Sequence, residues 1–177
     1  MKSSPIAIGI VICLLSHLAY GQASPNDVPT TLREFVHKVD PNAAWKLTDQ
    51  QDAAGARSFD VELTSQTWQD ITWKHDMLVF QPADLKHPNH VLLYITGGNN
   101  FSKPKAEDRV LGATLAALSG TRVALLFQVP NQPLLGGRFE DDLITDTGGF
   151  HRATRDDRWP LLFPSVKSAV RAMDCLE

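Results

Sequence analysis

Cysteine is nearly absent from this sequence, since the 177 residues contain only two. Two cysteines exclude a disulfide framework and a four-thiolate zinc site. An excess of charge of one sign is also lacking, because 17 Lys and Arg face 20 Asp and Glu, for a net charge of −3. Without a basic cluster, we expect no binding to nucleic acid. The apolar share of 43% is ordinary for a globular protein, and the length suits a single domain.

The apolar run near the N-terminus is too short for a membrane helix, which needs about 20 apolar residues. Lys2 precedes this run over 6–15, and small residues follow, among them Gly21 and Ala23. This order is typical of a secretory signal. We therefore expect residues 1–23 to be a signal peptide that is cleaved after Gly21 or Ala23. The protein would then be secreted or periplasmic, with no membrane contact after cleavage.

Cleavage at this point would leave a single cysteine in the mature chain. Cys13 would be removed with the signal, and Cys175 would remain. An odd cysteine in an exported protein suggests that its partner lies elsewhere. That partner would lie in another chain or in sequence outside these 177 residues.

Several common catalytic motifs are missing as well. No G-x-S-x-G occurs, and without that strand-to-helix elbow we expect no activated serine in this chain. The sequence has neither a Walker A loop nor a G-x-G-x-x-G fingerprint, so nucleotide binding is poorly supported and no cofactor is expected. The nucleophile of any serine hydrolase chemistry would have to come from outside the chain.

The first part of the sequence predicts antiparallel strands. Residues 24–43 indicate an extended arm and a short helix, with capping-box spacing between Thr31 and Glu34. The segment 49–57 has no apolar periodicity, so we expect it to be the long loop of a hairpin. The strands are expected over residues 44–48, 58–64 and 73–80, and the second of them alternates apolar with polar residues.

From residue 91 the pattern changes to that of a parallel sheet. Val91–Ile95 and Val123–Val129 are apolar runs, the second interrupted only by Gln128, and such runs are typical of strands that are covered on both faces. A helix is expected between them, capped by Ser102 and stopped by Gly120. Strand, helix and strand in this order predict a parallel βαβ unit.

The last segment of the sequence is a predicted helix. An irregular segment over 131–158, with a short helix over 140–144, leads to an apolar stripe whose helix opens near 160–164. A parallel sheet requires such a helix to lead into another strand, so the strand over 123–129 would keep an unpaired apolar edge. We therefore expect residues 44–177 to form an incomplete α/β domain, the front half of a longer protein.

The most suggestive local feature is the turn Gly97-Gly98-Asn99 after the first apolar run. Glycines at the carboxyl end of a parallel strand let the backbone bend and present N–H groups to an anion. A plain strand-to-helix turn is the simpler alternative, since turn glycines are common. On the first interpretation Gly97, Gly98 and Asn99 are candidates for an oxyanion hole, the set of N–H donors that stabilises a developing negative oxygen.

The residue after this turn begins an N-glycosylation sequon, Asn100-Phe101-Ser102. A glycan on Asn100 would crowd the same loop. Asn100 would therefore stay unmodified, or the source is bacterial, or the loop is not catalytic, and the sequence leaves these alternatives open.

Other candidate residues give weaker signals. His87 and His90, with His75 upstream, have a spacing that could suit a metal, but a solvated loop explains the pair more simply, and we expect no metal site. Trp68, Trp73 and Trp159 could stack on a sugar ring, although such residues more often pack in a core.

Several stretches of the sequence resemble, in order, those of one family, the PhoPQ-activated pathogenicity-related proteins, which include autocrine proliferation repressor relatives. The most specific are SQTW at 65–68 and VPNQPL at 129–134. The others are LT at 63–64, WKH at 73–75, LYITGGN at 93–99, Gln128, ED at 140–141, WPLLFP at 159–164 and AMD at 172–174. The segment 136–158 departs most from the family, so no residue role is carried over there.

The resemblance implies an α/β-hydrolase-like fold and an exported protein. It also implies that the last helix leads into a serine-bearing nucleophile elbow, so that the whole catalytic triad would lie beyond Glu177. Only the loop Gly97-Gly98-Asn99 matches an active-site position of the family, as an oxyanion-hole contributor.

Two functions are compatible with these observations. In the first, the full-length protein cleaves an ester or amide bond of a small-molecule or peptide substrate, and residues 1–177 are inactive alone. In the alternative, the protein is an exported, non-catalytic binding or signalling protein of the proliferation-repressor type, because a fold does not fix a function. A truncated gene product without function is the third possibility.

Overall fold

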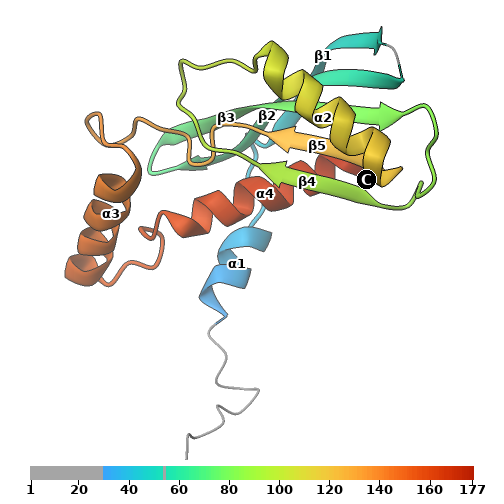
Figure 1. The fold of residues 1–177 in the computed structure, drawn as a ribbon. Coiled ribbons are helices and arrows are strands. Elements are labelled where there is room, and N and C mark those ends of the chain that lie inside the picture. The colour runs from blue at the N-terminus through green and yellow to red at the C-terminus, as the bar shows by residue number, and fades with distance from the viewer. Residues whose placement is uncertain (1–29, 54) are drawn as a thin grey trace, which may run out of the picture.

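A computed structural model describes residues 30–53 and 55–177 of the chain. The strands are β1 (Ala44–Ala53), β2 (Ala56–Trp68), β3 (Ile71–Pro82), β4 (Val91–Ile95) and β5 (Arg122–Leu126). The helices are α1 (Thr31–His37), α2 (Ala106–Ser119), α3 (Glu140–Thr154) and α4 (Leu162–Leu176). The strands form one sheet in the order β1-β2-β3-β5-β4, with α2 on one face and α4 on the other (Figure 1). The predicted signal peptide lies outside the described residues.

The antiparallel part of the sheet is longer than the sequence pattern predicts. The first hairpin is confirmed, but the long loop expected over 49–57 is wrong, because β1 and β2 pair as far as Ala53 and Ala56 around a tight turn at Gly55. The polar residues of this segment lie in strands because β1 is an exposed edge strand, so no apolar alternation is required. A second tight turn, at Gln69 and Asp70, joins β2 to β3.

The parallel βαβ unit is confirmed, since β4 and β5 pair in parallel with α2 between them in the chain. The expectation that the second apolar strand keeps an open edge is wrong. β5 also pairs antiparallel with β3, from Met77 opposite Leu126 to Phe80 opposite Val123. The crossover therefore places β4 outside β5, and the open edge of this part of the sheet belongs to β4.

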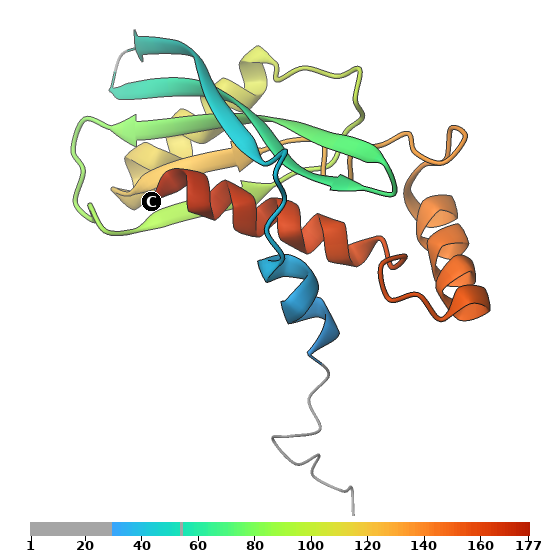
Figure 2. The ribbon, with the colours of Figure 1, turned by 180° about the vertical axis from the view of Figure 1, so that it is seen from behind.

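Both faces of the central strands are buried, which explains their continuous apolar runs. Toward α4, Met77 of β3 and Leu126 of β5 pack with Ala172. Toward α2, Leu78 of β3 and Leu125 of β5 pack with Ala116 of the helix and with Phe80 of β3. In Figure 2, which shows the sheet from behind, α4 crosses the face opposite α2.

The C-terminal helices begin at the end of the sheet where β2 turns into β3. Trp68 and Trp73 are buried there with Leu143 of α3, so these two tryptophans are core residues. The ring of Trp159 packs edge-on against Trp68. The helix predicted over 140–144 is confirmed but continues to Thr154. In the described part of the chain, no helix is long and apolar enough to cross a membrane.

Candidate functional site

The loop that follows β4 is held by the segment that follows β5. The backbone N–H of Gln128 donates to the carbonyl oxygen of Gly97 at 3.0 Å. The side-chain amide of Gln132 donates to the carbonyl oxygen of Gly98 at 2.9 Å. One residue further on, the N–H of Asn100 donates to the carbonyl oxygen of Gln132 at 2.7 Å. The loop is thus fixed through two successive carbonyl groups and one amide.

This arrangement determines where the remaining N–H groups of the loop point. In a trans peptide the C=O and the following N–H point in opposite directions. Because the carbonyls of Gly97 and Gly98 point toward residues 128–132, the N–H groups of Gly98 and Asn99 point away from them. Among the described residues neither N–H has a hydrogen-bond acceptor. The loop therefore presents two unused donors, as an anion-binding turn requires.

The surface beside the loop is open and carries charges of both signs. A hollow of about 200 Å³ is bordered by Gly97 and Gly98 and by the start of α2. Lys103 and Lys105 line it together with Glu107. A small ligand could therefore reach the loop from solvent.

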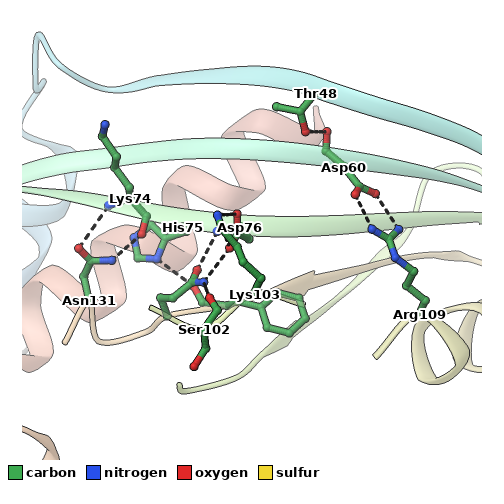
Figure 3. Close-up of polar contacts among 11 residues, drawn as sticks. Thr48, Asp60, Lys74, His75, Asp76, Ser102, Lys103, Arg109 and Asn131 are labelled. Carbon is green, nitrogen blue, oxygen red and sulfur yellow. Dashed lines mark hydrogen bonds and ion pairs between the residues drawn. The ribbon is translucent and has the colours of Figure 1, made fainter. Parts of the chain in front are cut away.

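One of these lysines belongs to a polar cluster that fastens the loop to β3 (Figure 3). The Nζ of Lys103 lies 2.8 and 3.1 Å from the two carboxylate oxygens of Asp76. The side-chain amide of Gln128 donates to Asp76 at 2.8 Å and to the carbonyl oxygen of Ser102 at 2.9 Å. The carboxylate of Asp76 is therefore paired with the charge of Lys103 and hydrogen-bonded to Gln128. This arrangement suits a residue that supports the loop.

Figure 3 also shows two further polar contacts that hold the fold together. The side chain of Asn131 binds the backbone N–H and C=O of Lys74, which ties the segment after β5 to β3. The guanidinium of Arg109 donates to both carboxylate oxygens of Asp60, which ties α2 to β2.

A buried Ser–His pair lies on the other side of β3. The Oγ of Ser65 lies 3.0 Å from the Nε2 of His75, and the Nδ1 of His75 lies 3.0 Å from the carbonyl oxygen of Phe127. Since a carbonyl only accepts, Nδ1 carries the proton and Nε2 accepts from Ser65. The Oγ of Ser168 on α4 lies 3.0 Å from that of Ser65.

Burial excludes this pair from catalysis. Ser65 is 0% exposed and His75 is 2% exposed, so no substrate can reach them. Burial also lowers the pKa of His75 to about 4, which keeps the imidazole neutral. The network fastens α4 to the sheet.

Sequence patterns missed this network because it depends on a β-bulge. Thr64 pairs with Lys74 and Gln66 with Trp73, so the residue between them, Ser65, has no partner of its own. A bulge breaks the strict alternation of faces. Both Ser65 and Gln66 consequently lie buried against α4, where Gln66 donates to the carbonyl oxygen of Pro164 at 2.7 Å. The available signal was the run of polar residues over 64–67, which interrupts the alternation of apolar and polar residues in β2.

The other candidates from the sequence lie apart from one another. The rings of His87 and His90 pack against each other, whereas His75 is in the core. Residues 30–53 and 55–177 contain no group of three His, Cys, Asp or Glu placed to hold a metal. The side-chain amide of Asn100 donates to the carbonyl oxygen of Asn131 at 3.1 Å. Cys175 is a free, half-buried thiol, and burial raises its pKa.

Solved structures define the class of this fold. Acetyl xylan esterase 1 from Thermoanaerobacterium sp. JW/SL YS485 matches 82% of this chain and 44% of its own, with a TM-score of 0.51 and 14% identity. A Bacteroides fragilis NCTC 9343 protein described as a candidate acetyl xylan esterase matches 82% of this chain and 40% of its own, with a TM-score of 0.50 and 13% identity. The fold is of the α/β-hydrolase type.

Sequence comparison identifies the family. Residues 32–177 match the family described as PhoPQ-activated pathogenicity-related protein, and the chain belongs to it. The autocrine proliferation repressor protein A of Dictyostelium discoideum is 28% identical, over 95% of this chain and 35% of that protein. The chain thus spans about a third of the length of this curated relative.

Proposed function

We propose that this chain is the N-terminal part of an exported hydrolase that cleaves an ester or amide bond. The observation that carries the proposal is the pair of unused N–H groups on Gly98 and Asn99, held outward at the carboxyl end of a parallel strand. Such donors stabilise the negative oxygen that develops when a nucleophile attacks a carbonyl, an effect typically worth about 3 kcal/mol per donor.

The nucleophile in this proposal comes from sequence that follows Glu177. The open edge of β4 supports this, because Tyr94 and Ile95 next to the loop are 45% and 47% exposed. The end of α4 supports it too, since Leu176 and Val91 border one surface hollow. A strand that follows α4 could begin there and run parallel to β4, which would bring its carboxyl end beside Gly98.

In the complete protein, a serine would attack the substrate carbonyl while the N–H groups of Gly98 and Asn99 hold the developing oxyanion. A histidine from the later sequence would take the proton from the serine and give it to the leaving alcohol or amine as the ester or amide bond breaks, while an acid holds the histidine in place. Water would then hydrolyse the acyl-enzyme and free the serine. Residues 1–177 would then be inactive by themselves. The substrate would be a small molecule or peptide, and the signal peptide would place the reaction outside the cytoplasm.

The test is to express the reading frame past Glu177 and to assay the full-length protein and residues 24–177 with p-nitrophenyl acetate and a p-nitroanilide. We expect turnover by the full-length protein, none by residues 24–177, and none when the elbow serine is replaced by alanine. Turnover by residues 24–177, or a full-length protein that lacks a serine at this position, would contradict the proposal.

A non-catalytic role is the second candidate, and one observation favours it. The curated relative is named a proliferation repressor, which describes signalling rather than hydrolysis. If this applies to the present chain, the full-length protein keeps the fold and binds a partner without turnover, and replacement of any serine in the elbow leaves its biological effect unchanged.

A further inference from the structure

The loop after β4 has little rigidity of its own. Gly97 and Gly98 carry no Cβ, and Gly98 has φ +102°, a conformation that other residues rarely adopt. Apart from the residues adjoining in the chain, no heavy atom lies within 4 Å of the position that a Cβ would occupy on either glycine. The orientation of the Gly98–Asn99 peptide must therefore be set by a hydrogen-bond partner and not by packing.

We propose that Gln132 is the positioning residue that keeps the N–H of Asn99 turned outward as an oxyanion donor. The inference rests on the proposed function. The side chain of Gln132 is bonded to the carbonyl of the same peptide, so it acts through the backbone and touches no substrate.

The side chain of Gln132 is itself held in one orientation. It is 3% exposed, and its Oε1 accepts from the N–H of Glu140, at the start of α3, at 2.8 Å. Because Oε1 is fixed by a donor, Nε2 must face the other way, toward Gly98. The carbonyl oxygen of Gln132 accepts from the N–H of Asn100. Gln132 thus binds the loop on both sides of Asn99.

Replacement of this amide by a carboxylate reverses the polarity toward Gly98 and leaves the size unchanged. In Gln132→Glu the carboxylate still accepts from Glu140, but it now faces the carbonyl of Gly98 with an acceptor. Two acceptors repel each other, and a glycine peptide can rotate to relieve the repulsion. The rotated peptide turns its N–H toward residue 132 and its carbonyl toward the substrate, where it repels the oxyanion.

Asn131→Asp is the matched control. It makes the same change one residue earlier, and it also removes a donor from a backbone carbonyl, that of Lys74 on β3. This carbonyl belongs to a strand and not to the loop. A general loss of packing would affect both variants, whereas loss of the outward N–H would affect only Gln132→Glu.

The experiment measures ester hydrolysis by the full-length wild type and both variants from about pH 8 to about pH 5. We expect Gln132→Glu to lower kcat by about 10²-fold with little change in KM, and Asn131→Asp to leave kcat within about threefold. As the pH falls, the kcat of Gln132→Glu relative to wild type should recover, because a protonated carboxyl can donate to Gly98 again. A glutamate has a pKa near 4.3 in water, and burial raises it into this range. Equal losses in both variants, or no recovery at low pH, would overturn the inference.

A crystal structure of full-length Gln132→Glu at about pH 8 provides a readout without turnover. The inference predicts that the Gly98 carbonyl no longer faces residue 132, and an unmoved carbonyl would contradict it. If the wild-type protein is inactive, the proposed function fails, and this structure alone decides whether Gln132 orients the peptide.

Discussion

Two polar groupings lie on neighbouring residues of β3, and they differ in what they leave unsatisfied. At His75 the imidazole, Ser65 and Ser168 bond to one another and to the backbone, entirely inside the protein. At Asp76 the grouping extends through Gln128 to the Gly97 loop, where carbonyls are engaged and amides remain free. The first grouping is closed inside the core, whereas the second leaves the N–H groups of Gly98 and Asn99 without an acceptor among the described residues.

The largest expected difference between the two groupings is in their response to acid. The pKa of His75 lies at about 4, below its ordinary value of 6.5, because burial disfavours the charged imidazole. As the pH falls through this range, the unfolded chain binds a proton that the folded chain does not bind. The free energy of unfolding should therefore drop by about 3 kcal/mol as the pH falls from 6.5 to about 4. Above pH 6.5, His75 makes no contribution to the pH dependence.

Urea unfolding of the full-length protein, followed by tryptophan fluorescence at several pH values, checks this expectation. His75→Gln is the control, since a glutamine can keep both hydrogen bonds but does not titrate. The difference in stability between wild type and His75→Gln should change by about 3 kcal/mol across this range. A difference that is constant with pH would contradict the closed network.

A smaller loss is expected from Ser168→Ala. This change removes the hydroxyl that bonds to Ser65 in the core, and we expect it to lower the free energy of unfolding by about 2 kcal/mol. Ser165→Ala, on the same helix, removes only a bond within the helix to Leu161, and it should change the stability by less than about 0.5 kcal/mol. Equal effects in urea unfolding would show that the network contributes nothing of its own.

In the loop, Gly98→Ala should cost about 1 kcal/mol, because alanine is strained at φ +102° although space is available. Gly148→Ala is a control with the opposite sign. Gly148 lies exposed inside α3 with open space around it, so alanine should stabilise the protein by about 0.5 to 1 kcal/mol. Thermal unfolding of both variants tests whether the loop needs its left-handed glycine.

The smallest effect is expected at the exposed ion pair. The side chain of Lys103 is 72% exposed, and Asp76 keeps its bonds with Gln128 when the lysine is lost. Lys103→Met should therefore lower the free energy of unfolding by less than about 0.5 kcal/mol, and the difference should fade in high salt. A larger loss would mean that the lysine itself holds the loop in place.

The sequence predicts the parts of this fold that have a local signature. The strand after Gly120 could be found because burial on both faces requires a continuous apolar run. Val91–Ile95 has the same pattern, but the expectation that it is covered on both faces is wrong for the described residues, where it is a half-exposed edge strand. The length of β1 could not be found in this way, since this exposed edge strand is polar over most of its length. The place of β5 between β3 and β4 follows from pairing between distant segments, which no local pattern encodes.

The same distinction holds for the candidate site. The glycines of the loop are visible in the sequence, because a sharp bend after a strand requires residues without a Cβ. Gln128 and Gln132 lie in stretches that resemble the family, but their role is not visible there, because an amide in an irregular segment looks like any solvated residue until its partner is known. The residues that orient the loop therefore had to come from the structure.

The proposed hydrolase site depends on the N–H groups of Gly98 and Asn99 being free to bind an oxyanion. The most direct test is to titrate ¹⁵N-labelled full-length protein with a phosphonate that mimics a tetrahedral oxyanion, and to follow the backbone amide signals. We expect downfield shifts for Gly98 and Asn99 and little change for Asn100, whose N–H is already bonded to Gln132. Unchanged signals at Gly98 and Asn99 under saturating phosphonate would contradict this expectation.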